Sequence, residues 1–366
     1  MRVLIITNHM EGTDGWSRYS LDLANELERR HVEIVCVVSR KSRAGLSERV
    51  CLAGPMEYLC NMAMSRLDAQ KMQSVINEFR PDAIHVVVEP YLSLLPFIEV
   101  PDKTRIVATM HGTYAYIPGI FRNPIKKAVS ALMYLRSTKK VDKFIIVSDY
   151  TKNKIVQKPL SRIAGVLGKM VVIKNAIDFD SIKPADLLAR VDGRKHVLFV
   201  GAIKPRKGIA NLIRAFHLYN EKYNRKAVLD IVGSGDMSNL VTNGDVRIHG
   251  RVKADELDRL YSATDAFALL AVPNKHTFEG FGLVYLEANA RGVPTLGSRD
   301  SGASDAIVHG KTGYLADDPY DIDECAWYLH KILDEKAIMP GDCIEWAKAH
   351  DVKLAVDKII SQYQII

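Results

Sequence analysis

The sequence lacks an apolar run of the ~20 residues that a transmembrane helix needs. Its first apolar run, Val3 to Ile6, is too short for the core of a signal peptide and is typical of a buried strand. The five cysteines are odd in number and show no CxxC spacing, so we expect reduced thiols rather than disulfides or a zinc site. These absences predict a cytoplasmic protein.

Metal and dinucleotide motifs are also missing. None of the eleven histidines has HxH or HExxH spacing. Asp178 and Asp180 form the DxD pattern of metal-dependent transferases, but they follow KNAI at the expected domain junction, and we interpret them as structural. Gly233 and Gly235 follow a predicted strand, yet Ser238 stands where a dinucleotide fingerprint has its third glycine. We therefore expect no metal site and no cofactor.

The overall composition is that of an ordinary globular protein, with 48% hydrophobic and 25% charged residues. At 366 residues the chain exceeds the roughly 250–300 residues at which one core stops growing, so we expect two domains. The net charge of +7 is uneven, because residues 120–140 hold six cations and no acidic residue. A basic face of this kind suits anionic lipid or a phosphorylated substrate. Nucleic acid is not expected, because base-stacking aromatics are not interleaved with the cations.

Short β-branched runs alternate with helical patterns, as in parallel sheets that helices cover on both faces. The predicted strands are residues 3–7, 33–38, 83–88, 104–110, 144–147, 171–174, 196–200, 228–232, 246–249, 266–270, 295–297 and 313–315. The predicted helices are residues 16–30, 68–80, 207–219, 255–263, 283–291 and 322–333, with a break at Pro340 and Gly341 before a last helix over 351–364. A charged stretch near 180–191 separates two doubly wound α/β units.

Segment 277–314 carries the most informative pattern. A Gly-Phe-Gly turn leads into a predicted helix, with Glu279 just before the turn and Glu287 one turn into the helix. Glycines let the backbone approach a ligand, and the free N–H groups at a helix start suit a diphosphate. Glu287 can accept hydrogen bonds from ribose hydroxyls, and Glu279 from sugar hydroxyls. On spacing alone, two surface glutamates at a helix start are an equally good interpretation.

Six ordered segments resemble family 4 of the glycosyltransferases. Glu279 and Glu287, with seven residues between them in EGFGLVYLEANARGVP, followed by GASDAIVHGKTGYL, are similar to the family signature. The other five are Asp14-Gly15 followed by RYSLDLANEL, His111-Gly112 after a strand, IIVSDYTKNKIV with VVIKNAIDFDSIKP, VLFVGAIKPRKGIANLIRAF, and VRIHGRVKADELDRLYSATDAF.

The resemblance implies the GT-B fold, an α/β architecture of two doubly wound, Rossmann-like parallel-sheet domains that face each other across a deep cleft. Residues 1–183 would form the acceptor-side domain, with the helix 350–366 packing back on it, and residues 184–349 the donor-binding domain. The implied donor-binding residues are Gly15, Arg251, Gly280, Phe281, Gly282, Leu283 and Glu287. The implied catalytic residues are His111, Arg206, Lys207 and Glu279.

Two adjacent cations follow the first strand of the second domain. The planar guanidinium of Arg206 can bind a phosphate through two parallel hydrogen bonds, and the ammonium of Lys207 adds a compact positive charge. The resemblance implies that this pair holds the donor diphosphate and neutralises it as it leaves. Many relatives have an arginine directly after the glycine, where this chain has Ala202. Another variant places the arginine immediately before the lysine, so the role is assigned to Arg206.

The resemblance also implies a mechanism that retains the anomeric configuration without a metal. No carboxylate can be singled out as a covalent nucleophile, unlike the paired carboxylates of retaining glycosidases. The implied reaction is therefore front-face substitution, in which the leaving phosphate takes the acceptor proton. His111 would orient the donor sugar or the acceptor hydroxyl, and Gly15 would let the first loop approach the diphosphate.

The basic stretch 120–140 predicts the acceptor side. Its cations alternate with apolar residues, so it can form an amphipathic helix that docks on anionic lipid. The alternative is a helix that packs on its own sheet and leaves its lysines solvated. The residues assigned to the acceptor and membrane side are Tyr114, Arg122, Lys126 and Lys127.

The predicted function is transfer of a hexose or N-acetylhexosamine from a nucleotide diphosphate sugar, with UDP favoured over GDP. The expected acceptor is a hydroxyl of a glycan or a lipid-linked glycan, as in the assembly of cell-surface polysaccharide. The protein would be cytoplasmic, with peripheral attachment to the inner face of the plasma membrane as a second interpretation. The alternatives are a nucleotide-sugar epimerase or hydrolase of the same fold, and a non-catalytic, membrane-associated partner of another transferase.

Overall fold

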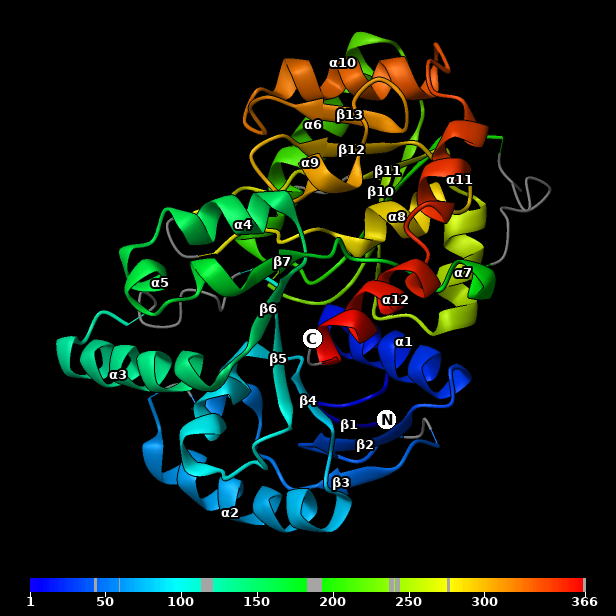
Figure 1. The fold of residues 1–366 in the computed structure, drawn as a ribbon. Helices are drawn as coiled ribbons and strands as arrows, with labels where there is room; N and C mark the ends of the chain where they lie inside the picture. Colours follow the sequence, from blue (N-terminus) through cyan, green and yellow to red (C-terminus); the bar gives the residue numbers. More distant parts are fainter. Residues whose placement is uncertain are drawn as a thin grey trace. The chain divides into compact units, whose positions relative to one another are not determined.

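The computed structural model describes residues 1–42, 45–58, 60–112, 121–182, 193–236, 240, 244–274 and 277–364. The chain forms two compact units, one of Met1–Ala176 with Val352–Ile366 and one of Ile177–Asp351 (Figure 1). The boundary expected between residues 183 and 184 lies outside the described residues, within 183–192.

The first unit is built on a parallel sheet that has seven strands in the part of the chain described, in the order β3-β2-β1-β4-β5-β6-β7. Its central strands are buried apolar runs, as a sheet covered on both faces requires; Val3 to Ile6 are 0% exposed. The strands are β1 (Arg2–Ile6), β2 (Glu33–Val38), β3 (Glu48–Val50), β4 (Ala83–Val86), β5 (Arg105–Met110), β6 (Lys143–Ile146) and β7 (Met170–Val172). The helices are α1 (Gly15–Arg29), α2 (Met62–Phe79), α3 (Pro124–Lys140), α4 (Asp149–Val156), α5 (Pro159–Ile163) and α12 (Val352–Tyr363).

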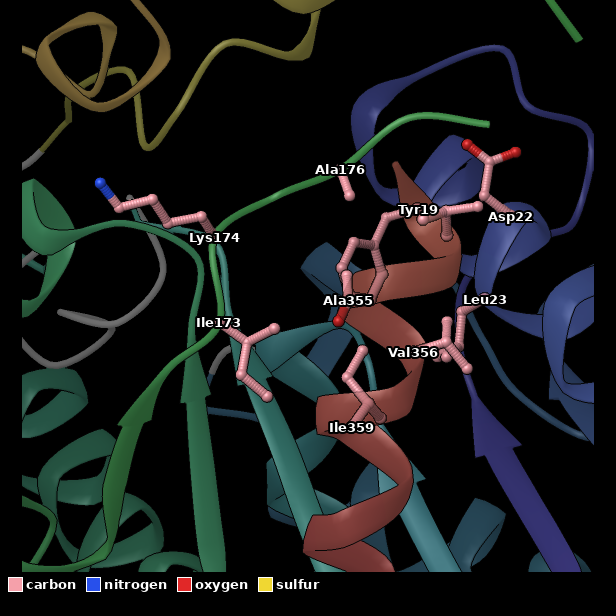
Figure 2. Close-up of a pocket in the computed structure, with 10 residues that line it drawn as sticks. Tyr19, Asp22, Leu23, Ile173, Lys174, Ala176, Ala355, Val356 and Ile359 are labelled. Atoms are coloured by element: carbon pink, nitrogen blue, oxygen red, sulfur yellow. The ribbon is translucent and has the colours of Figure 1, made fainter. Parts of the chain in front are cut away.

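The last helix belongs to the first unit, although the chain passes through the second unit before reaching it. α12 packs along α1, and the Arg30 guanidinium at the end of α1 donates to the Asp357 carboxylate and to the Lys353 carbonyl, each at 2.9 Å. Figure 2 shows the ring of Tyr19, on α1, beside Val356 and Ile359 of α12. A cavity of about 10 Å³ remains there, room for about one water molecule.

The second unit is built on another parallel sheet, with six strands among the described residues, in the order β10-β9-β8-β11-β12-β13. The strands are β8 (His196–Val200), β9 (Val228–Val232), β10 (Val246–Gly250), β11 (Ala266–Ala268), β12 (Thr295–Ser298) and β13 (Gly313–Ala316). The helices are α6 (Ile209–Lys222), α7 (Ala254–Ser262), α8 (Leu283–Asn289), α9 (Ala303–Ala306), α10 (Ile322–Leu333) and α11 (Pro340–Lys348).

Four expectations about local structure were wrong. Pro340 does not break the chain; it occupies the first turn of α11, where its missing N–H costs nothing. α2 begins at Met62 rather than at residue 68, because the Asn61 side chain caps it through the Met64 N–H at 3.0 Å. β3 was not predicted, because two of its three residues are charged and the strand is mostly exposed. α6 begins at Ile209 rather than at residue 207, because Pro205–Lys207 form a 3₁₀ turn.

Candidate functional site

The strand order places a switch point in each sheet. In the second unit the chain runs from β8 outward to β9 and β10, then returns to β11 on the other side of β8. Ligands of open parallel sheets bind beyond the carboxyl ends of the strands at such a point. The loops that follow β8 and β11 carry the predicted cations and Glu279, so the sheet brings together residues far apart in sequence.

The loop after β8 is fixed by a glycine that no other residue can replace. Gly208 has a φ of +63°, and a Cβ built there would lie 1.6 Å from the carbonyl oxygen of Leu270. The Val272 N–H also donates to the Arg206 carbonyl at 2.9 Å. These contacts hold the 3₁₀ turn against the segment that follows β11, and they set the side chains of Arg206 and Lys207 beside that segment.

We predict that Gly208→Ala lowers the melting temperature more than Gly310→Ala does. Both glycines lie in the second unit at positive φ, but among the described residues nothing lies within 4 Å of a Cβ at Gly310. Gly310→Ala therefore costs only the ~1–2 kcal/mol of a left-handed backbone, whereas Gly208→Ala adds a collision with backbone. Thermal unfolding followed by circular dichroism checks this order, and equal shifts would show that the collision is relieved at no cost.

The two predicted cations share one carboxylate oxygen. Oε2 of Glu279 lies 3.0 Å from Nη1 of Arg206 and 2.5 Å from Nζ of Lys207. The side chains of Lys207 and Glu279 are only 11% and 13% exposed. Burial alone would raise the pKa of the Glu279 carboxyl, but the charges of Lys207 and then Arg206 lower it below its ordinary value. Burial lowers the pKa of the Lys207 ammonium, and Glu279 opposes that change. The carboxylate is therefore ionised at neutral pH and pairs with both cations.

The Gly-Phe-Gly turn leads into α8 as predicted. Gly282 precedes the helix with a φ of +88°, and a Cβ there would lie 2.5 Å from the Tyr285 ring. In the described part of the chain no side chain caps the first N–H groups of α8. Gly302, in the loop after β12, lies against the Gly-Phe-Gly turn. A Cβ built at Gly302 would lie 2.3 Å from the Gly280 carbonyl. The Gly302 N–H donates to the Glu279 carbonyl at 2.8 Å. Glycine is therefore required at both loops.

The second glutamate of the signature is oriented by a tyrosine that the sequence did not single out. The hydroxyl of Tyr261, on α7, donates to Oε2 of Glu287 at 3.1 Å, and the Arg291 guanidinium lies over the same ring at 4.6 Å. Burial raises the pKa of Tyr261 well above its ordinary value, so this hydroxyl stays a donor. Arg251 lies two strands from β8, after β10, where its Nε donates to Oγ of Ser234 at 3.0 Å.

The switch point of the first sheet lies between β1 and β4. Asp14 closes the loop after β1: its Oδ1 caps α1 through the N–H groups of Trp16 and Ser17, each at 3.0 Å, and its Oδ2 lies 3.0 Å from Nε2 of His9. Gly15 is exposed, and no described residue lies within 4 Å of a Cβ built there. The fold therefore does not require this glycine, in keeping with a role in admitting a ligand.

His111 follows β5 on the same edge of the first sheet. Its ring meets the Tyr19 ring edge-on at 4.9 Å, and its Nε2 is buried without a hydrogen-bond partner among the described residues. Burial lowers the pKa of His111 to about 4, so the imidazole is neutral at neutral pH. A buried polar atom of this kind calls for a partner such as water or a ligand.

A buried glutamate supports His111 and was missed in the sequence. Glu89 follows β4 and is 1% exposed, and its Oε1 accepts from the His111 N–H at 2.5 Å. Burial raises the pKa of this carboxyl to about 7, against the opposing effect of backbone N–H groups that include those of His111 and Gly112. The signal was a charged residue directly after an apolar strand, which is unexpected unless the carboxylate has partners.

The predicted acceptor side forms a helix of mixed burial. α3 begins after Asn123, whose Oδ1 accepts from the Ile125 N–H at 2.9 Å. Arg122, Lys126 and Lys127 are exposed, and Ile125 beside them is 73% exposed. Tyr114 lies outside the described residues. In the chain as described, no helix is long and apolar enough to cross a bilayer, and no group of three His, Cys, Asp or Glu side chains is placed to hold a metal ion.

Comparison with known proteins places the chain in a family. Residues 13–181 match the family model described as Glycosyltransferase Family 4, and residues 186–350 match the model described as Glycosyl transferases group 1. The chain is 31% identical over 247 residues to an uncharacterized glycosyltransferase of Methanocaldococcus jannaschii, covering 63% of this chain and 60% of that protein, less than two-thirds of its length.

Two other known proteins are similar to a larger part of the chain. It is 29% identical over 340 residues to the GDP-mannose-dependent alpha-(1-6)-phosphatidylinositol monomannoside mannosyltransferase of Mycolicibacterium smegmatis, covering 86% of this chain and 85% of that protein. Its fold is similar to that of HepE from Anabaena, solved in complex with UDP and glucose, with a TM-score of 0.76 at 17% identity over 99% and 98% of the two chains. At that identity the likeness shows the fold, which is GT-B.

Proposed function

Because this chain belongs to family 4 of the glycosyltransferases, we propose that it transfers a sugar from a nucleotide diphosphate donor to an acceptor hydroxyl. The observation that carries the proposal is the pair Arg206 and Lys207, held by Glu279 at the switch point of the second sheet. A diphosphate carries the charge that such a pair binds best. We assign the donor to the second unit and the acceptor to the first.

The experiment that tests this proposal is a thermal-shift panel of UDP, GDP and their hexose and N-acetylhexosamine conjugates, followed by a transfer assay with the best ligand. A ligand at 100 times its Kd stabilises the folded chain by ~2.7 kcal/mol. We place UDP-sugars first, while the name of the mycobacterial relative specifies GDP-mannose, so the panel includes both bases. If no nucleotide sugar raised the melting temperature, the proposal would fail. Product analysis with and without acceptor separates transfer from hydrolysis or epimerisation.

We propose that the reaction retains the anomeric configuration. The bond between C1 of the sugar and the β-phosphate oxygen breaks, the acceptor oxygen forms its bond to C1 on the same face, and the acceptor proton moves to the departing phosphate. Negative charge then grows on the diphosphate, where Arg206 and Lys207 stabilise it. His111, neutral at neutral pH, supplies a hydrogen bond that orients the donor sugar or the acceptor hydroxyl rather than a charge.

We also propose that no metal ion takes part in the transfer. The two side-chain cations supply the charge neutralisation that a divalent ion supplies in metal-dependent transferases. Activity is therefore expected to survive exhaustive treatment with EDTA, measured as product formed per minute before and after chelation. A loss restored by Mg²⁺ or Mn²⁺ would overturn this part of the proposal.

The exposed start of α3 supports a membrane-facing acceptor side, so we propose a lipid-linked glycan as acceptor and peripheral attachment to an anionic membrane. Lys126 and Lys127 directly follow the exposed Ile125, and basic amphipathic helices use this combination of cations and an apolar side chain at lipid headgroups.

Flotation with phosphatidylglycerol-containing vesicles tests this attachment. We expect the chain to float with the vesicles at low salt, and Lys126→Glu/Lys127→Glu to remain at the bottom of the gradient. The control is Lys226→Glu/Lys253→Glu, which makes the same change in charge at exposed positions of the second unit. If the wild-type chain failed to float, or if both double variants lost flotation equally, α3 would have no special role.

A further inference from the structure

A line of buried polar groups leads from the last helix of the chain toward His111. The hydroxyl of Tyr363, at the end of α12, lies 2.7 Å from Nδ1 of His85 on β4. Nε2 of the same imidazole lies 2.7 Å from Oγ1 of Thr109 on β5. His85 and Thr109 are 0% exposed and Tyr363 is 3% exposed. Both nitrogens of His85 are therefore used, and the line joins a helix to two neighbouring strands.

The line continues to the candidate catalytic histidine through one tyrosine. Oγ1 of Thr109 also lies 3.3 Å from the hydroxyl of Tyr19 on α1. The ring of Tyr19 then meets the His111 imidazole edge-on, with 4.9 Å between centroids and 86° between planes. Thr109 thus anchors the hydroxyl end of Tyr19, and the anchored ring limits the orientations open to His111.

The groups in this line keep one protonation state at neutral pH. Burial, and to a lesser degree the nearby His111, lowers the pKa of His85 to about 3, so the imidazole is neutral. Burial raises the pKa of Tyr19 to about 12 and that of Tyr363 well above its ordinary value, so both hydroxyls keep their protons. A neutral imidazole donates from one nitrogen and accepts at the other, which gives the line a direction without a charge.

The alternative is that His85 only attaches α12 to the sheet, through its hydrogen bond with Tyr363, and has no role at His111. α12 already has another fastening, since Asp357 pairs with Arg30 and the helix packs along α1. A hydrogen bond from Tyr363 to His85 would therefore add little to the attachment of α12. Replacing a buried polar pair by apolar groups is also often neutral for stability. The continuation through Thr109 and Tyr19 to His111 is what this interpretation leaves unexplained.

We propose that Tyr363, His85 and Thr109 are positioning residues that hold the His111 imidazole, through Tyr19, in its working orientation. The inference rests on the proposed function, in which His111 orients a reacting group. It makes the last helix, which the chain reaches only after completing the second unit, part of the machinery of the first unit.

The test is a double-mutant cycle between Tyr363→Phe and His111→Ala. Tyr363→Phe removes one hydroxyl and keeps the ring, so it is expected to lower kcat by roughly three- to tenfold while the KM for the donor stays within about twofold. In the His111→Ala background the same change is expected to have no further effect, because the group being positioned is gone. An equal loss in both backgrounds would show a general structural role and overturn the inference.

Three further variants distinguish a positioning role from a general loss of folding. Asp357→Asn removes the charge from the other attachment of α12, the ion pair with Arg30, without touching the Tyr363–His85–Thr109 line, and it is expected to leave kcat unchanged. Thr109→Val is expected to repeat the loss seen for Tyr363→Phe, and Thr109→Ser, which keeps the hydroxyl, to restore most of it. If Asp357→Asn lowered kcat as much as Tyr363→Phe, loosening of α12 alone would account for the loss and the inference would fall.

Failure of the inference can be told apart from failure of the proposed function. Side-chain ¹⁵N resonances of His111, assigned by comparison with His111→Ala, report the ring whether or not the chain transfers a sugar. We expect Tyr363→Phe to shift them and Asp357→Asn to leave them in place. Unmoved resonances in Tyr363→Phe would overturn the inference, whereas full activity of His111→Ala would overturn the role given to His111 itself.

Discussion

Lys207→Ala is expected to lower kcat/KM for the nucleotide sugar by about 30- to 1000-fold, which corresponds to a loss of ~2–4 kcal/mol of transition-state stabilisation. The ammonium is nearly buried, so its field is little screened by water, and in the proposed reaction it stabilises the negative charge that grows as the diphosphate leaves. The loss should appear in kcat as well as in KM, because the charge on the phosphate is greater in the transition state than in the bound donor.

The matched control for this variant is Lys204→Ala. Lys204 is exposed and precedes the same 3₁₀ turn, so its removal changes the net charge equally without touching the Glu279 carboxylate. Its kcat/KM is expected to stay within about twofold of wild type. Full activity of Lys207→Ala in a folded chain would refute the donor assignment, and equal losses in both variants would point to net charge rather than to a specific contact.

Glu279→Gln is expected to separate binding from transfer. In the structure the Glu279 carboxylate pairs with both cations, so a diphosphate that binds them as we propose must share them with this carboxylate or displace it. The neutral amide competes less, and the Kd for UDP, which has no sugar hydroxyls, should fall by roughly 3- to 30-fold. Transfer should nevertheless fall by about 100-fold, because the cations and the sugar lose the group that orients them.

Isothermal titration with UDP and a transfer assay on the same preparation check this pair of results. Glu256→Gln is the control, since Glu256 is an exposed carboxylate of the same unit on α7. Weaker binding of UDP to Glu279→Gln would contradict the proposed competition between the carboxylate and the diphosphate.

The ion pairs of Glu279 also make the stability of the chain depend on pH. The pKa of Glu279 in the folded chain lies below the ordinary value of 4.5. Its contribution to the free energy of unfolding is therefore complete above pH 4.5 and is lost as the pH falls through the lower folded pKa.

The sheets could be predicted closely because a parallel strand buried on both faces has a mostly apolar sequence. The bounds of β2, β8 and β9 coincide with the predicted ranges for that reason. Exposed elements carry no such signal, which is why β3 was missed. The start of α6 was misplaced because the cations of a tight turn resemble the polar first turn of a helix, and the glycine after them was the better guide.

Individual site residues could be predicted, but their partners could not. Arg206, Lys207 and Glu279 could be identified from the sequence. We assigned the two cations to the phosphates and the carboxylate to the sugar. The ion pairs of Glu279 with Arg206 and Lys207, 73 and 72 positions away in the chain, were not predicted. His85 and Tyr363 are 278 positions apart, and no local pattern joins them. Such contacts follow from strand order and from the return of α12, which are properties of the whole fold.

A crystal structure of the chain with a bound nucleotide sugar would show whether Arg206 and Lys207 bind the donor diphosphate. We predict diphosphate oxygens within hydrogen-bonding distance of the Arg206 guanidinium and the Lys207 ammonium, with the Glu279 carboxylate turned away from at least one of these two cations. A diphosphate bound at another edge of the second sheet, while Glu279 keeps both cations, would contradict this prediction.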